Sequence, residues 1–223
     1  MWRLAAWIAG LFVLWIALGS PLAALDHHLL TAHMAQHLLL MTVAAPLILL
    51  AAVNRRRAFK GIVIHPALCW LAGTATVIAW HIPSLFELGM RSAQWHAFEQ
   101  VTFLAAGLLF WWPVIQPWPS VVRMPRWGVP LYLFLATLPC DALSAFLTFC
   151  DRVVYPHYLS AHPLFSPHLF SPNRIFDISP LADQEYAGAL MWVWVTFAYL
   201  APAVLITIQM LSPQRRALNA NVV

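Results

Sequence analysis

Charged residues are scarce in this sequence. Asp, Glu, Lys and Arg make up only 9% of the 223 residues, whereas soluble domains carry about 25%. The hydrophobic share is 62%, which excludes the charge-covered surface of a soluble protein. Several uncharged stretches are long enough to cross a bilayer, for which roughly 20 apolar residues suffice. The sequence therefore predicts an integral membrane protein.

Cysteine is also rare. The three cysteines, Cys69, Cys140 and Cys150, form no CxxC pair, which excludes a thioredoxin-like motif and a two-cysteine metal clamp. Cys140 and Cys150 are separated by about 15 Å along one predicted helix, too far for a disulfide. We therefore predict three buried, apolar thiols.

The apolar stretches predict an all-α, polytopic bundle that forms one transmembrane domain over residues 1–223. Lipid offers no hydrogen-bond partner to the backbone, so each span must be helical. A proline-rich stretch, residues 151–185, is expected to be an outer loop, because its five prolines oppose a long helix. The six predicted spans lie at about residues 3–22, 28–52, 62–82, 94–116, 128–150 and 187–211.

The first span has an alternative interpretation. Residues 1–25 carry one basic residue, an apolar run and small residues near the end, which is also typical of a cleaved secretory signal. The apolar run is long for a signal and favours a retained helix. Cleavage leaves the orientation of the later spans unchanged.

The basic residues predict the orientation of the bundle. Nine of the twelve lie at one set of helix ends, and only Arg91, Arg152 and Arg174 lie at the other. Positive residues concentrate on the cytoplasmic side, which places both termini in the cytoplasm. The net charge of +4 is then a topology signal, so membrane lipid is an expected partner and nucleic acid is not. All eight acids and nine of the ten histidines fall on the extracytoplasmic side.

Two histidines lie within the second predicted span. His33 and His37 are four residues apart and share one helix face with Met41. An imidazole surrounded by lipid needs partners for both of its nitrogens. The pair therefore indicates a polar site inside the bundle, although a single HxxxH also occurs as a structural feature at membrane rims.

Other predicted spans carry metal-ligand types at a similar depth. His81 ends the third span, His96 and Glu99 share a face of the fourth, and Asp141 lies level with His37 in the fifth. Ionisable residues within spans usually face the bundle interior with a partner. A carboxylate beside a ligating imidazole fixes its tautomer. We predict an extracytoplasmic metal site formed by His33, His37, His96, His81, Glu99 and Asp141.

Copper is the expected metal, with another transition metal as the alternative. Imidazole and carboxylate suit several metals, whereas thioether sulfur shifts the preference towards Cu(I). Methionines at such positions are also common core residues. The predicted gating or auxiliary residues are Met34, Met41, Asp183 and Met191. Trp111 and Trp112 are predicted to anchor the fourth span at the cytoplasmic interface.

These residues resemble the CtaG family, membrane factors for the assembly of caa-type cytochrome c oxidase. The resemblance runs from about residue 10 to residue 212. It implies a non-catalytic, multi-pass protein of the bacterial cytoplasmic membrane that helps to make active haem–copper oxidase. Oxidase subunits are the implied partners and copper delivery the implied role. The matching elements are Ser20-Pro21-Leu22, His33-Met34 with Gln36-His37, Pro46, His81 with Pro83, His96, FWWPV at 110–114, and Asp183-Gln184 with Gly188, Met191 and Trp192.

Two features depart from the family pattern. Members usually have seven helices, and the expected absence of the first leaves six here. Many members also carry a second histidine one turn after the position of His96, where this chain has Gln100. The departure puts the number of ligands from the fourth span in question.

Three other functions are compatible with the residues. A diiron oxygenase-like membrane enzyme also uses histidine boxes, but HxxxH occurs once and no HxxHH follows. A haem-binding electron carrier needs histidines near both membrane faces, and only His65 lies near the inner one. A metal transporter needs polar residues through both halves of the membrane, whereas the inner halves offer only residues such as Thr74 and Gln209.

Overall fold

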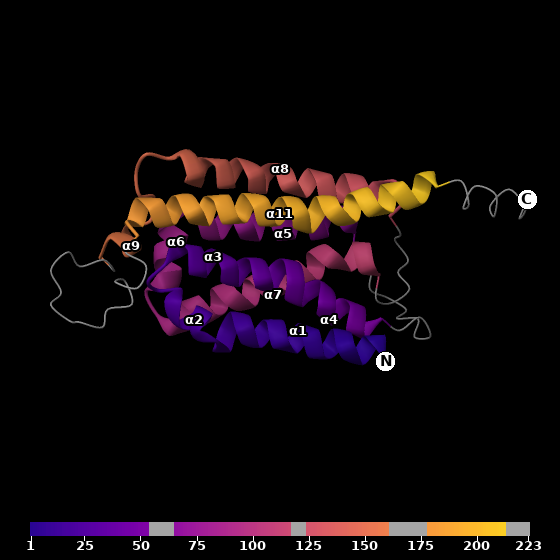
Figure 1. Cartoon of the computed structure of the whole chain (residues 1–223), viewed down its shortest axis with the longest axis horizontal. Coiled ribbons are helices and arrows are strands. Elements are labelled where there is room, and N and C mark those ends of the chain that lie inside the picture. The colour runs from indigo at the N-terminus through magenta and orange to yellow at the C-terminus, as the bar shows by residue number, and fades with distance from the viewer. Residues whose placement is uncertain (54–64, 117–123, 161–177, 213–223) are drawn as a thin grey trace, which may run out of the picture.

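The computed structural model describes residues 1–53, 65–116, 124–160 and 178–212. Every regular element in these ranges is a helix, which confirms the predicted all-α class. The long helices lie along one axis, with α8 and α11 on one side of the bundle and α1 on the other (Figure 1). The short helices α6 and α9 meet at one end, which we call the α9 end.

Five spans in the described ranges are long and apolar enough to cross a membrane, and a bent helix pair makes a sixth if it is counted as one span. The predicted membrane bundle is thus confirmed. The spans are α1 (Trp2–Gly19) with α2 (Pro21–Leu25); α3 (Leu30–Leu38) with the π-helix η1 (Leu39–Ala44) and α4 (Ala45–Ala52); the bent pair α5 (Pro66–His81) and α6 (Pro83–Met90); α7 (Ala93–Ile115); α8 (Gly128–Phe149); and α11 (Pro180–Leu211).

Large apolar side chains cover the outside of the bundle. Trp7, Phe12 and Trp15 of α1 are exposed, as are Phe197 and Leu205 of α11. Soluble monomers rarely expose continuous apolar surface on this scale. The surface matches a lipid solvent, as the composition predicts.

The third predicted span, 62–82, ends at a sharp bend, and a short helix follows it. Helices α5 and α6 meet at 78°, and the break falls at Ile82, whose backbone is extended before Pro83. Proline removes a helical hydrogen bond and disfavours helical geometry in the preceding residue. The bend ends α5 at His81 and leaves the carbonyl of His81 to accept a hydrogen bond from the Tyr155 hydroxyl (3.1 Å).

The last span begins earlier than the sequence predicted. Helix α11 starts at Pro180, with Ser179 as its N-cap; proline fits the first turn, where its missing N–H is not needed. Asp183 and Glu185 therefore lie inside a helix and not in the loop. The short helix α9 (Pro156–Ser160) occupies another part of that loop.

Other predictions lie outside the described residues. They concern the remainder of the outer loop, residues 161–177, and the first residues of the third predicted span. They also concern most of the basic residues used for orientation: Arg55, Arg56, Arg57, Lys60, Arg123, Arg174, Arg215 and Arg216.

The second span changes to π-helical geometry directly after the HxxxH pair. The Trp111 indole donates to the carbonyl oxygen of Met41 within this segment (3.1 Å). Trp111 is only 6% exposed, so its predicted role as an interfacial anchor is wrong. The Met41 carbonyl is the physical reason, because it offers the indole N–H a partner inside the bundle. Single π turns are frequent at functional sites.

Candidate metal centre

A buried carboxylate of α7 lies against two imidazoles of α3. Glu99 Oε1 is 3.4 Å from His33 Nε2 and 3.2 Å from His37 Nε2. The two Nε2 atoms are 2.7 Å apart, as the four-residue spacing on one helix face allows. The side chains of His33, His37 and Glu99 are almost fully buried. The predicted pair thus has its partner inside the bundle.

His96 brings a third imidazole to the same carboxylate. It precedes Glu99 by one helical turn, and its Nδ1 lies 3.7 Å from Glu99 Oε2. His33, His96 and Glu99 each offer one ligand atom, and these atoms all lie within 4.8 Å of one another. We call the four residues His33, His37, His96 and Glu99 the His–Glu cluster.

The donor atoms of the His–Glu cluster fit a metal ion. His33 and His37 face Glu99 with their Nε2 atoms. Nδ1 of His96 and Oε2 of Glu99, which lie 3.7 Å apart, are buried without a hydrogen-bond partner among the residues that the structure describes, although most buried polar atoms have one. Nitrogen or oxygen ligands about 2.0–2.1 Å from a tetrahedral ion are separated by about 3.3 Å. The two histidine–glutamate separations, 3.2 and 3.4 Å, match this value. The 2.7 Å between the histidines is a hydrogen-bond length.

Asp26, which is not among the predicted site residues, completes the surroundings of the cluster. Asp26 lies in the turn between α2 and α3, is 2% exposed, and its Oδ2 is 3.0 Å from His96 Nε2. Burial acts to raise the pKa of Asp26, but the His96 hydrogen bond and the nearby imidazoles outweigh it and hold the pKa below its usual value. The ionised carboxylate accepts from His96 Nε2–H, which turns the lone pair of Nδ1 towards Glu99.

A series of imidazoles leads from the surface to the cluster. His27 is exposed, and its ring centroid lies 5.1 Å from that of His96. The next centroid separations are 5.5 Å from His96 to His33 and 4.3 Å from His33 to His37. Burial of part of the ring lowers the pKa of His27, which favours the neutral form that can bind a metal. Imidazoles, which can bind a metal ion, therefore lie at each step from the surface to the His–Glu cluster.

Helix α9 and the chain before it cover this end of the bundle. The Tyr158 hydroxyl donates to the backbone carbonyl of Asp26 (2.7 Å), and Tyr155 donates to that of His81. Burial raises the pKa of both tyrosines, so their hydroxyls stay protonated and remain donors. The Tyr158 bond holds the turn that carries Asp26, and the Tyr155 bond holds the end of α5.

Two of the six predicted ligands lie outside the cluster. His81 Nδ1 is 2.7 Å from the Val77 carbonyl, and the ring faces a cavity beside His37. Asp141 interacts with Thr137 on its own helix, and its Oδ1 has no hydrogen-bond partner. The predicted set is therefore brought together only in part, because equal depth along two helices does not place side chains on facing sides.

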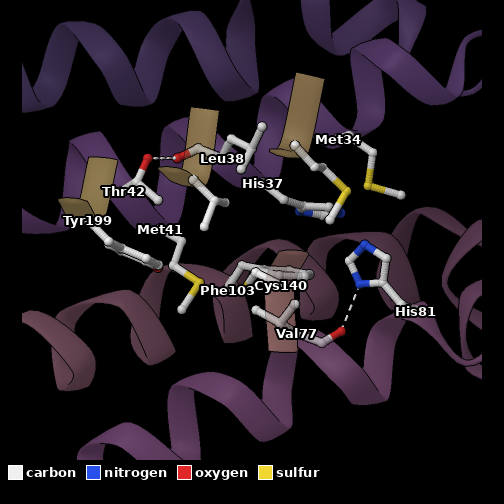
Figure 2. Close-up of a pocket in the computed structure, with 12 residues that line it drawn as sticks. Met34, His37, Leu38, Met41, Thr42, Val77, His81, Phe103, Cys140 and Tyr199 are labelled. Atoms are coloured by element: carbon white, nitrogen blue, oxygen red, sulfur yellow. Dashed lines mark hydrogen bonds between the residues drawn. The ribbon is translucent and has the colours of Figure 1, made fainter. Parts of the chain in front are cut away.

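The predicted auxiliary residues separate into two groups. Met34, Met41 and Met191 line the cavity beside His37 (Figure 2). Asp183 instead caps the N-terminus of α3: its carboxylate accepts from the backbone N–H of Leu30 and from the N–H and hydroxyl of Thr31. Those bonds hold α11 against α3, so the structure gives Asp183 an anchoring role.

Substituting Asp26 with asparagine is expected to weaken metal binding without removing a ligand. The amide keeps the shape of the side chain but can present a donor instead of an acceptor to His96, so the Nδ1 lone pair is no longer fixed. Changes to such supporting partners cost roughly 10- to 100-fold in metal affinity. A chelator-competition titration measures the effect. Asp151→Asn is the matched control because Asp151 is exposed, and equal affinities in both variants contradict the assigned role.

An all-α membrane bundle with a buried histidine–carboxylate cluster near one end defines a multi-pass membrane protein with a candidate metal centre. The chain belongs to the family described as "Cytochrome c oxidase caa3 assembly factor (Caa3_CtaG)", whose family model matches residues 1–212. This match confirms the resemblance found in the sequence.

Two curated relatives are the uncharacterized proteins Mb0105 of Mycobacterium bovis and MT0111 of Mycobacterium tuberculosis. Each is 24% identical over 220 residues, which covers 85% of this chain. The chain spans 31% of the length of each of these two proteins. No solved structure matches the chain significantly.

Proposed function

We propose that this protein takes part in cytochrome c oxidase assembly by binding copper at the His–Glu cluster and delivering it to the oxidase. The family description supports the assembly role. The observation that carries the metal part is the convergence of His33, His96 and Glu99, whose ligand atoms lie within 4.8 Å of one another inside the bundle. Copper is a cargo in this proposal, and the role is non-catalytic.

Each residue has a defined part in holding the cargo. Neutral imidazoles of His33, His37 and His96 supply nitrogen ligands that suit copper, and Glu99 supplies the negative charge that offsets the ion. Asp26 keeps Nδ1 of His96 available. Burial of the cluster excludes competing water. These features support specific binding of the ion inside the bundle.

The series of imidazoles between the His–Glu cluster and the surface supports release of the ion to a partner. The exposed His27 lies beside His96, which lies beside His33. An ion can pass along such a series by exchanging one imidazole for the next, and never has to be desolvated without a ligand. The distribution of basic residues supports an extracytoplasmic position for this end. An oxidase subunit docked at the α9 end is the proposed recipient.

The test is the copper content of the purified protein in detergent after anaerobic exposure to Cu(I) and washing. We expect about one ion per chain at the His–Glu cluster, because four donors complete one coordination sphere. The double variant His33→Ala/His37→Ala is expected to lose it. His65→Ala is the matched control, since His65 caps α5 through Ala67 N–H and is exposed. Equal, near-zero copper in the native protein and the double variant contradicts the proposal.

A further inference from the structure

A second group of metal-type donors surrounds a cavity of about 30 Å³ beside the His–Glu cluster. The cavity lies among α3, η1, α5, α7, α8 and α11, deep in the bundle (Figure 2). Sulfur dominates its potential ligands: the thioethers of Met34, Met41 and Met191 and the thiol of Cys140. Met34 and Met41 come from the same span. The sulfur atoms of Met191 and Cys140 come from two other helices, α11 and α8.

Two nitrogens of the lining residues have no hydrogen-bond partner among the described residues: His81 Nε2 and His37 Nδ1. His81 Nδ1 is used by the Val77 carbonyl, but His81 Nε2 is buried without a hydrogen bond, in a residue that is 8% exposed. Figure 2 shows this second nitrogen pointing into the space towards His37 and Met34. An unpaired buried nitrogen costs free energy comparable to a lost hydrogen bond, so the atom itself indicates a ligand.

The size and chemistry of the cavity restrict that ligand. A space of about 30 Å³ admits a water molecule or a single ion and no organic molecule. The remaining walls include the apolar Leu38, Val77 and Phe103 and the hydroxyl residues Thr42 and Tyr199. Thr42 Oγ1 already bonds the Leu38 carbonyl and the Trp194 indole. None of the described residues that line this cavity carries a carboxylate, so a divalent ion would lack compensating charge. Thioethers and a neutral imidazole instead suit monovalent copper.

His37 connects this cavity with the His–Glu cluster. Its Nε2 lies 3.2 Å from Glu99 Oε1, and its ring also forms part of the cavity wall. The two donor sets are therefore neighbours that share one imidazole, with a nitrogen–oxygen set towards the α9 end and a sulfur-rich set deeper in the bundle.

We infer that the cavity is a second, sulfur-rich site for Cu(I), lined by Met34, Met41, Met191 and His81, which receives the ion from the His–Glu cluster through His37. The source of the ion rests on the proposed function, whereas the ligand set of the cavity does not. The site makes the protein selective for monovalent copper, because the ion meets only uncharged donors there.

The test is X-ray absorption of Cu(I) bound to the full chain in detergent, with Cu(I) alone as the probe. We expect copper–sulfur scattering in the native protein and its loss in Met34→Leu/Met191→Leu. Leucine nearly preserves the volume of methionine, so such changes cost under about 1.5 kcal/mol each. Met90→Leu is the matched control, because Met90 is equally buried but does not line the cavity; it is expected to keep the sulfur signal.

The outcomes separate this inference from the proposed function. Bound copper with only nitrogen and oxygen neighbours in the native protein overturns the sulfur site and leaves the His–Glu cluster standing. A sulfur signal that persists unchanged in Met34→Leu/Met191→Leu also overturns the inference. Sulfur-bound copper that is retained at the native level in His33→Ala/His96→Ala supports the cavity and contradicts the His–Glu cluster as the source.

Discussion

Replacing Glu99 with glutamine is expected to remove copper from the His–Glu cluster while the helices stay folded. Glu99 is the one carboxylate in the cluster, and its two oxygens lie within 3.7 Å of three imidazoles. Glutamine keeps the shape but loses the negative charge and presents an N–H₂ group that repels a cation. The loss of affinity should exceed the roughly 10- to 100-fold typical of residues that only support a ligand.

Copper per chain and a chelator-competition titration measure this loss, and circular dichroism confirms that the variant is helical. Glu185→Gln is the matched control, since Glu185 lies on α11 and is exposed. The same chemical change there should leave copper binding at the native level. A Glu99→Gln protein that binds copper as tightly as the native one contradicts the assignment of Glu99 as a ligand.

The helices could be predicted from the sequence because lipid leaves the backbone no alternative to internal hydrogen bonds. The end of the third span could also be predicted: its expected end at 82 lies one residue beyond the last residue of α5, His81. The start of the last span was harder. Acidic residues at 183 and 185 look like a loop, although Ser179 and Pro180 start a helix before them.

The candidate site could be predicted where the ligands share a helix. The HxxxH spacing identifies His33 and His37, and the i, i+3 spacing identifies His96 and Glu99. Spacing within one helix does not show which side chains of two helices face each other. The depth of a residue along its helix does not tell in which direction around the helix axis its side chain points. Asp141 therefore matches His37 in depth but interacts with Thr137 on its own helix. Asp26 was missed because it lies in a turn, outside every span.

Part of the family pattern stabilises the bundle and lies outside the His–Glu cluster. Asp183 caps α3, and Gln184 binds the chain that leads to α9: it accepts from Val154 N–H and donates to the carbonyls of Leu147 and Arg152. Gly188, one turn later, lies at the contact between α11 and α8. These residues hold the α9 end together, which fixes α3 and its histidines.

Gly188→Ala is accordingly expected to be strongly destabilising. A Cβ atom at position 188 would lie 2.5 Å from Thr148 Oγ1, 2.8 Å from the backbone nitrogen of Thr148 and 2.9 Å from the Ser144 carbonyl oxygen. Two of these three atoms are backbone, so α8 and α11 must separate to admit the methyl group. Small residues allow this close approach of membrane helices, and overpacking a tight contact costs about 1–3 kcal/mol.

Thermal unfolding in detergent, with copper content measured on the folded fraction, tests this expectation. Gly10→Ala is the matched control, because a Cβ there meets the Ile48 side chain at 3.3 Å, which can move, and the change gains helix propensity. We expect a clear fall in Tm for Gly188→Ala and little change for Gly10→Ala.

Since Asp183 and Gly188 belong to one helix that anchors α3, copper binding should weaken with the loss of Tm. A Gly188→Ala protein with native Tm contradicts the close α8–α11 contact, and one with lowered Tm but native copper affinity contradicts the link between that contact and the His–Glu cluster.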